Sequence, residues 1–214
     1  MLEDFVDVRG GSLLALGGGR SFAEGGWGGT PLSDALPIVL DPGSRGPQFP
    51  PAELIVRTTP TGVNHPATQI TDKAEDAPAK WRDLPPLTSL NPVTEVKPGA
   101  TVLLTGINER NRQQVVLAFQ RYGRGKAMVM PVQDTWMWRM HAKMDLKDKT
   151  HHTFGQRRVR WVVDGVPDRV MASVTPDRVQ RGEPFTITGE VSDPEYKGIN
   201  DGRITARVTS PSGK

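Results

Sequence analysis

The hydrophobic positions near the start of the chain change from helical to extended spacing. Residues 2–9 carry apolar side chains three or four positions apart, which predicts a helix, and the glycine pair at 10–11 would end it. The apolar run at 12–16 then predicts a short buried strand. The glycine-dense segment at 17–29 predicts a loop at the carboxyl end of that strand, where open α/β sheets bind their ligands.

The middle of the chain predicts short elements separated by turns. Thr30 is a candidate N-cap with Pro31 at the first helical position, so a helix is expected through about Leu36. Residues 42–70 read as a long excursion rich in proline, glycine and threonine. The other expected elements are strands at 37–41 and 53–58 and a helix at 76–84 that is stopped by Pro85 and Pro86.

Longer regular elements are predicted in the second half of the first domain. Residues 101–107 read as a strand, and residues 113–135 as a strand followed by a hairpin with its turn at 123–125. A helix at 150–164 would close the domain. The expected domains are therefore residues 1–165, an α/β domain, and residues 166–214.

The second domain changes to alternation of apolar and polar residues. Three such segments, near 170–176, 184–193 and 202–210, predict strands of an antiparallel sheet. An immunoglobulin-like sandwich needs about seven strands, so a partial Ig-like domain is expected here. The first domain is also expected to be incomplete at its N-terminus, because it opens on a helix where a doubly wound fold opens on a strand.

Composition narrows the chemistry that this chain can perform. With 214 residues, 36% hydrophobic and 24% charged, it should fold, and the absence of cysteine excludes disulfides and thiol nucleophiles. No apolar run reaches the about 18–20 residues of a membrane span, so membrane association is expected only through segments outside this chain. Residues 107–169 hold 13 Lys and Arg against 6 Asp and Glu, but no nucleic-acid motif accompanies them and no nucleic-acid partner is predicted.

Several segments in order resemble one family. The stretch FVDVRGGSLLALGGGRSFAEGGWGGTPLSDALPIVL and the later KPGATVLLT, QRYGRGKAMVM and QDTWMWRM resemble class I glutamine amidotransferase-like domains of large bacterial envelope proteins, often found beside a von Willebrand factor A domain. The likeness covers about residues 2–165. It implies a flavodoxin-like sheet flanked by helices, an Ig-like module after it, and a membrane-anchored parent at the cell envelope.

The resemblance also implies a site from which the chemistry has been lost. Active members use a cysteine on a sharp strand-to-helix turn and a histidine near a glutamate on a later strand, whereas this chain has Gly17 to Ser21 and then Gln133 to Thr135 at those places. We therefore predict a non-catalytic module without cofactor or metal. It would bind a partner domain of the parent or an envelope protein, or a small ligand, in a degenerate pocket formed by Gly18, Gly19, Arg20, Ser21, Asp134, Thr135, Trp136 and His141.

Three other interpretations remain open. Ser21 could be a hydrolase or amidase nucleophile with Asp134 and with His141 or His65, although its GRSFA context lacks the second glycine of G-x-S-x-G. The glycine loop with Arg20 could hold a phosphate, although no nucleotide motif is present. The domain could also be a structural spacer, whose strand ends would be filled by side chains.

Two smaller clusters have a simpler explanation. The cluster of His141, Asp145, Asp148, His151 and His152 has no ligand spacing typical of a metal site, and a solvated loop is expected. Trp136 and Trp138 are two positions apart, so one is expected in the core and the other at the surface.

Overall fold

The computed structural model divides the chain into two compact units, Met1–Val166 and Pro167–Lys214. The structure describes residues 1–41, 53–91, 93, 95–108, 112–165, 170–176, 182–193, 199, 203 and 205. Residues 42–52 of the excursion predicted at 42–70, and most of the last predicted strand, lie outside the described residues. Each unit is treated by itself below.

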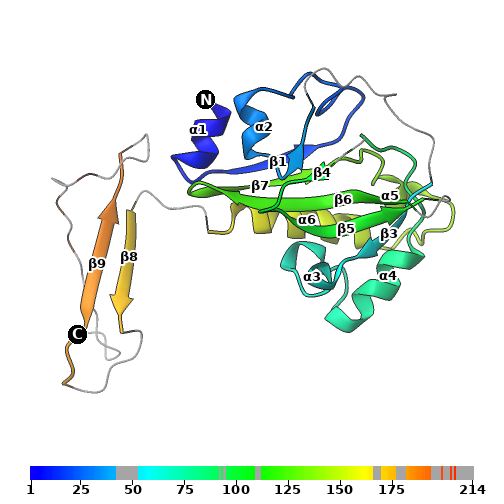
Figure 1. Cartoon of the computed structure of the whole chain (residues 1–214). Coiled ribbons are helices and arrows are strands. Elements are labelled where there is room, and N and C mark those ends of the chain that lie inside the picture. The colour runs from blue at the N-terminus through cyan, green and yellow to red at the C-terminus, as the bar shows by residue number, and fades with distance from the viewer. Residues whose placement is uncertain are drawn as a thin grey trace. The chain divides into compact units, whose positions relative to one another are not determined.

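A five-stranded mixed sheet forms the centre of the first unit (Figure 1). Its strands lie in the order β1 (Ser12–Leu16), β7 (Gly125–Met130), β6 (Gln113–Tyr122), β5 (Thr101–Ile107) and β3 (Ile55–Thr58). β1 runs parallel to β7, with Leu14 opposite Met128, and the other neighbouring strands are antiparallel. The prediction of an α/β domain with a sheet flanked by helices is confirmed.

The direction of the strands follows from how they are connected. β6 and β7 are joined by a two-residue turn at Gly123 and Arg124, with Gly123 at φ 53°, and so short a connection forces antiparallel pairing. β1 and β7 are separated by more than a hundred residues, which leaves room for a parallel crossover. A flavodoxin-like sheet is parallel, whereas among the described strands only the β1–β7 pair is.

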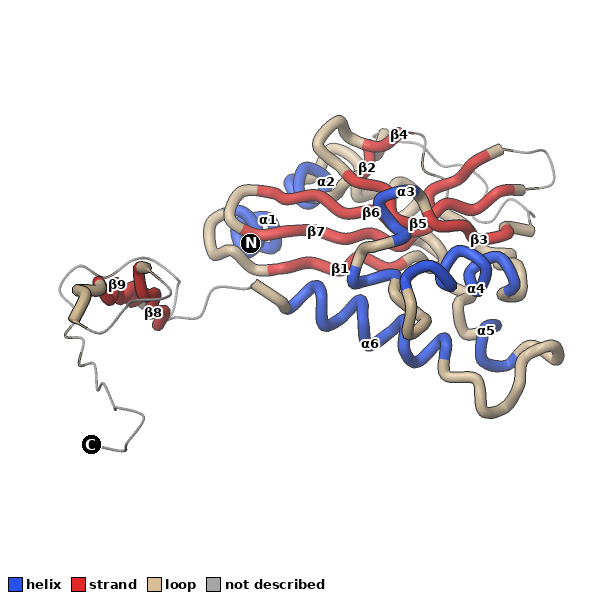
Figure 2. Tube along the Cα trace, turned by 90° about the horizontal axis from the view of Figure 1, so that it is seen from below, coloured by secondary structure: helices blue, strands red, loops and turns tan. Residues whose placement is uncertain are grey.

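Helices cover both faces of the sheet (Figure 1). α1 (Leu2–Asp7) and α2 (Pro31–Ala35) lie on one face, close to the short pair β2 (Ile38–Val39) and β4 (Glu95–Val96). The opposite face carries α3 (Pro60–Val63), α4 (Ala77–Asp83) and α6 (Thr150–Val163), with α5 (Met137–Met140) nearby (Figure 2). Two single-turn 3₁₀ helices, Pro66–Thr68 and Ala74–Asp76, connect α3 to α4.

An aromatic cluster holds the second face together. The ring centroid of Trp81 lies 5.4 Å from that of Trp138 and 4.9 Å from that of Phe154, and all three side chains are fully buried. Both indole N–H groups are satisfied, since Trp81 donates to the Thr68 carbonyl at 3.0 Å and Trp138 to the Pro85 carbonyl at 2.9 Å. These rings join α4, α5 and α6 into one packed layer, and truncation of a buried ring of this size costs about 3–5 kcal/mol.

The opposite face has its own, smaller core. Phe22 from the glycine loop packs with Leu36, Ile38 and Val129, among others. The glycine-dense loop is therefore anchored by an apolar side chain rather than held only by its backbone.

The second unit is described as a hairpin. β8 (Val170–Thr175) pairs antiparallel with β9 (Thr186–Val191), with Val174 opposite Ile187. The two predicted strands of alternating residues are thus present, and the Ig-like sandwich stays a prediction. Among the described residues, no helix is both long and apolar enough to cross a membrane.

Candidate functional site

Parallel pairing of β1 and β7 brings the two predicted parts of the site to one edge of the sheet. Leu16 lies opposite Met130 at the carboxyl ends of the strands, and the N–H of Gly17 donates to the Met130 carbonyl at 2.7 Å. The glycine loop after β1 and the segment after β7 therefore leave the sheet side by side, in the position where α/β folds place their sites.

The first glycine of the loop is required by close packing. A Cβ at Gly17 would lie 2.8 Å from the backbone of both Pro131 and Val132. A Cβ at Gly18 would meet the Ser21 hydroxyl at 2.9 Å, whereas a Cβ at Gly19 would meet nothing within 4 Å. Gly17 thus lets the loop approach the end of β7, and Gly19 lies in open space.

Asn91 fills the space between the two strand ends. Its Oδ1 accepts a hydrogen bond from the Gly18 N–H at 3.0 Å, and its Nδ2 donates to the Gly18 carbonyl at 3.0 Å. The backbone N–H of Asn91 donates to the Pro131 carbonyl at 2.7 Å. Because Asn91 is only 2% exposed, it fills the space beside Gly18 between the ends of β1 and β7.

Glu24 extends this network and leaves one oxygen unused. Its Oε2 accepts from Asn91 Nδ2 at 2.6 Å. Its Oε1 is buried and has no hydrogen-bond partner in the described part of the chain. A buried carboxylate oxygen is a strong acceptor, so this atom would pair with a donor such as water or a ligand N–H.

Asp134 is also committed to internal bonds. One oxygen accepts from the N–H of Thr88 at 2.5 Å, the Thr88 hydroxyl at 3.0 Å and the N–H of Ser89 at 3.0 Å, and the other accepts from the Ser89 hydroxyl at 2.6 Å. The side chain is buried. A carboxylate with these four donors clamps the segment before Asn91 and is not available as a base for another group.

Ser21 lies in a turn and not in a catalytic constellation. Its carbonyl accepts from the Gly25 N–H at 3.3 Å, and its hydroxyl makes no hydrogen bond to Asp134 or to a histidine within the described ranges. The one non-glycine residue with a positive φ in the loop, at 59°, is the next residue, Phe22. The Phe22 ring is buried and packs edge-on against Trp27 at 5.1 Å. The conformation that an elbow nucleophile adopts is therefore held by an apolar residue.

The candidate histidines lie elsewhere. His141 follows α5, and its Nδ1 accepts from the Lys143 N–H at 3.1 Å. His65 packs against the rings of both Phe119 and Trp161 on the other face of the sheet, with ring centroids 5.1 and 5.0 Å away. Burial, and then the nearby Lys126 charge, lower the pKa of His65. The structure does not assemble the Ser–His–Asp set that the hydrolase interpretation requires.

The remaining predicted residues divide between core and surface. Thr135 and Trp138 are buried, whereas Trp136 is 54% exposed at the start of α5. One core and one surface tryptophan were expected, but the alternation comes from a helical turn and not from a strand. Arg20 is exposed, and its backbone carbonyl lies close to Gly25.

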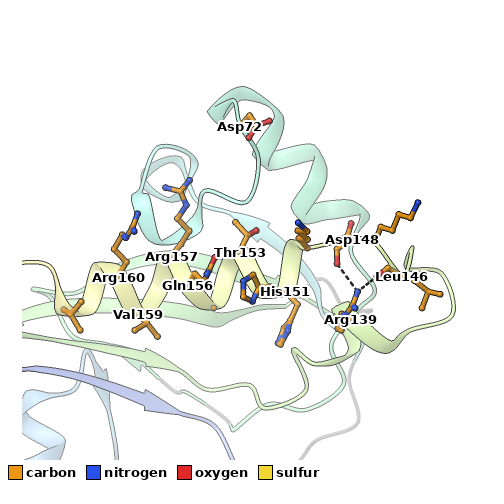
Figure 3. Close-up of a pocket in the computed structure, with 15 residues that line it drawn as sticks. Asp72, Arg139, Leu146, Asp148, His151, Thr153, Gln156, Arg157, Val159 and Arg160 are labelled. Atoms are coloured by element: carbon orange, nitrogen blue, oxygen red, sulfur yellow. Dashed lines mark hydrogen bonds between the residues drawn. The ribbon is translucent and has the colours of Figure 1, made fainter.

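A wide depression of ≈ 1580 Å³ lies away from these residues, along α6 and the loop before it (Figure 3). His151 and His152 line it, and so does Asp148, which pairs with Lys80 at 2.7 Å. Arg139 lies at one end and donates to the carbonyls of Leu146 and Asp148. No group of three or more metal-ligating acidic, histidine or cysteine side chains occurs among the residues that the structure describes.

Sequence reasoning missed the residues that close the site. Thr88, Ser89 and Asn91 come from the segment TSLN, which has the polar composition of an ordinary loop. Only the proline pair before it and Pro92 after it mark the segment as constrained. Nothing in the sequence pairs Asn91 with Glu24, which lies 67 positions earlier.

The comparisons with known proteins define a fold and not a family. No family model matches the chain, and no curated protein matches it. Two solved structures are similar. Cytoplasmic protein STM3548 from Salmonella typhimurium has 19% sequence identity and a TM-score of 0.54. Cytoplasmic protein STM1381 from Salmonella typhimurium LT2 has 20% sequence identity and a TM-score of 0.50. Each match covers 75% of this chain and 58% of the other, so the chain spans somewhat more than half the length of these neighbours.

Proposed function

We propose that residues 1–165 form a non-catalytic, class I glutamine amidotransferase-like module that binds a partner domain within a bacterial envelope protein. The main support is that the edge of the sheet at the carboxyl ends of β1 and β7 is closed by the chain's own side chains. Asn91 occupies the space beside Gly18, and Asp134 is used by Thr88 and Ser89. A scaffold that fills its own cleft is suited to surface interactions more than to turnover.

The strand arrangement supports the amidotransferase-like assignment. The resemblance implies a nucleophile turn after one strand and a histidine segment at a later strand, and here the glycine loop and the Gln133–Thr135 segment follow β1 and β7, which pair side by side. We extend the assignment to a flavodoxin-like ancestry, in which the antiparallel strands β6, β5 and β3 are an addition to the parallel pair. The envelope location rests on the sequence resemblance alone. The word cytoplasmic belongs to the names of the two solved neighbours and is not transferred to this chain.

The chemistry of the residues argues against turnover. Acyl transfer needs a nucleophile within hydrogen-bond reach of a base. Ser21 has no such base among the described residues, and Asp134 accepts four hydrogen bonds from the backbone and hydroxyls of its neighbours. A serine in this setting remains an unactivated alcohol.

A second candidate function is supported by Glu24. Its buried Oε1 has no hydrogen-bond partner in the described part of the chain, while its Oε2 accepts from Asn91. A small ligand that donates an N–H or ammonium group would satisfy it. This candidate keeps the module non-catalytic but makes it a sensor of an amine or amide.

An ammonia-release assay with L-glutamine tests the proposal. The wild-type chain, Ser21→Ala and Ser21→Cys should all release no ammonia above a blank, since a thiol at position 21 would still lack a base. Ammonia release that disappears in Ser21→Ala would refute the non-catalytic assignment. Thermal unfolding of the wild type and Glu24→Gln with and without glutamine or ammonium separates the two candidates, because only a ligand held by Glu24 raises the wild-type Tm and loses that effect in the variant.

A further inference from the structure

The depression along α6 is positively charged. Five cationic side chains line it, namely Arg139, Lys147, Lys149, Arg157 and Arg160. All five residues are exposed, and none of them forms an ion pair in the part of the chain that the structure describes. The charge of this surface is therefore not neutralised by salt bridges of its own.

The carboxylates in the depression do not balance these charges. Two line it, Asp72 and Asp148. Asp148 pairs with Lys80 at 2.7 Å and accepts from the Thr150 N–H at 2.7 Å, so its charge is already offset. Burial first, and then nearby cationic groups, lower the pKa of His151, another residue of the lining. Asp72 alone is left against the five cations.

The distribution of charge on α6 does not serve the stability of the helix. Its sequence, THHTFGQRRVRWVV, contains arginines and histidines and no aspartate or glutamate. Arg157 and Arg160 lie three positions apart on one side of it (Figure 3), and like charges at such spacing repel. Lys149 stands at the amino end, where the helix dipole favours negative charge. A negatively charged partner would relieve both effects.

The depression is also large and partly apolar. Its volume is ≈ 1580 Å³, whereas pockets for small molecules are about 300–1,000 Å³. Val159 and Val163 line it four positions apart and are 55% and 59% exposed, and Leu146 is 83% exposed. His152 and Gln156 add uncharged polar contacts on α6. This surface fits a segment of polypeptide better than a small ligand.

The lining favours a polypeptide over a nucleic acid. Proteins bind single-stranded nucleic acids by stacking bases on aromatic side chains. No phenylalanine, tyrosine or tryptophan lines the depression among the described residues. Exposed aliphatic side chains at four-residue spacing are instead the contacts that an amphipathic helix makes when it lies in a groove.

We infer that the depression along α6 binds an acidic amphipathic segment of the partner domain, and this rests on the proposed function that the module binds such a domain. Carboxylates of the segment would meet Arg157, Arg160 and the lysines before α6. Its apolar side chains would lie on Val159 and Val163. Complementary charge of this kind selects the partner and speeds association.

Fluorescence anisotropy of a labelled peptide, titrated with the full chain, tests this assignment. The probe has the 14-residue length of α6, is rich in glutamate and has two leucines four positions apart. We expect saturable binding that weakens about tenfold between about 0.05 and 0.5 M NaCl, because salt screens exposed charges. The same peptide with glutamine in place of glutamate should bind at least about tenfold more weakly.

Variants of the chain locate the surface. Arg157→Glu and Arg160→Glu should each raise the dissociation constant at least about fivefold, and Val159→Ser about threefold. Arg9→Glu is the matched charge reversal, on an exposed residue after α1 on the opposite face of the sheet, and should stay within about twofold. Thermal unfolding should show no loss of Tm in Arg157→Glu, since a like-charge pair with Arg160 becomes an opposite-charge pair.

Three results would overturn the assignment. The first is the absence of peptide binding at low salt, and the second is binding that the arginine and Val159 variants leave unchanged. The third is tighter binding of a single-stranded DNA of mixed sequence, which would make the depression a nucleic-acid surface. The ammonia-release assay is independent of all three, so a failure here is distinguishable from a failure of the non-catalytic assignment.

Discussion

Asn91 and Gly18 exchange two hydrogen bonds. The side-chain oxygen of Asn91 accepts from the Gly18 N–H and its amide nitrogen donates to the Gly18 carbonyl, both at 3.0 Å. A side-chain amide is one of the few groups that can satisfy both backbone atoms of a single residue. This pair joins the loop after β1 to the segment before β4, across 73 positions of sequence. It closes the edge of the sheet at the carboxyl ends of β1 and β7.

Replacement of Asn91 should therefore act on stability. Asn91→Asp removes the donor to Gly18 and places a second carboxylate next to Glu24, whose Oε2 now accepts from the amide. We expect a loss of about 2–4 kcal/mol in the free energy of unfolding, measured by urea denaturation near neutral pH. Asn64→Asp, on an exposed turn, is the control and should change it by less than about 0.5 kcal/mol. Equal effects in the two variants would mean that the bridge is not structural.

The glycine loop offers a second matched pair. Gly17→Ala places a Cβ 2.8 Å from the backbone of Pro131 and Val132, and backbone cannot move aside cheaply. The expected cost is about 1–3 kcal/mol. Gly19→Ala meets nothing within 4 Å and should be neutral or stabilise by up to about 1 kcal/mol through the unfolded chain. Thermal unfolding compares the two, and a lower Tm for Gly19→Ala than for Gly17→Ala would contradict this packing.

The Asp134 clamp is tested by an isosteric change. Asp134→Asn replaces one acceptor oxygen by a donor that faces the Thr88 or Ser89 donors. We expect a loss of about 1–3 kcal/mol in unfolding free energy and no change in any hydrolytic activity. Asp83→Asn, on an exposed position of α4, should be close to neutral. If Asp134→Asn were as stable as the wild type, the carboxylate would be free for another role.

Much of the fold follows from local pattern. The strands at 12–16 and 101–107, the helix at 150–163 and the hairpin turn at Gly123 are where spacing and turn chemistry predict them. Strand direction does not follow from such patterns, because it depends on which segments pair. The mixed sheet arises from the β6–β7 turn together with the distant partnership of β1 and β7.

The candidate site was less predictable for the same reason. Gly18 and Asp134 could be selected because they flank strand ends, but Asn91 and Ser89 lie in a segment with no motif. Their roles come from contacts across more than forty positions of sequence. The positive φ of Phe22 is likewise invisible in sequence, since phenylalanine is not typical of that conformation.

The His65 ring predicts a pH dependence of stability. Burial and the Lys126 charge lower the pKa of His65 below its ordinary value of 6.5, so the unfolded chain binds its proton more readily than the folded chain. The unfolding free energy should therefore be greatest above about pH 6.5 and fall as the pH drops below it toward the folded-state pKa. The pKa of His151 is also lowered, first by burial and then by neighbouring cationic groups.

Comparison with His65→Asn isolates this contribution. Asparagine keeps an acceptor for the Ala67 N–H, which His65 Nδ1 receives at 3.2 Å, but it does not titrate. Urea denaturation at about pH 7.5 and about pH 5.5 should show a smaller pH effect in His65→Asn than in the wild type. An unchanged pH effect would assign the dependence to His151 or to the carboxylates.

The closed edge at β1 and β7 is tested most directly by nuclear magnetic resonance of the ¹⁵N-labelled chain during titration with L-glutamine. We expect the amides of Gly18, Gly19 and Ser21 and the side-chain amide of Asn91 to keep their chemical shifts up to millimolar ligand. Saturable shifts confined to these groups would contradict it, because they would show that glutamine enters a site that Asn91 and Asp134 are proposed to fill.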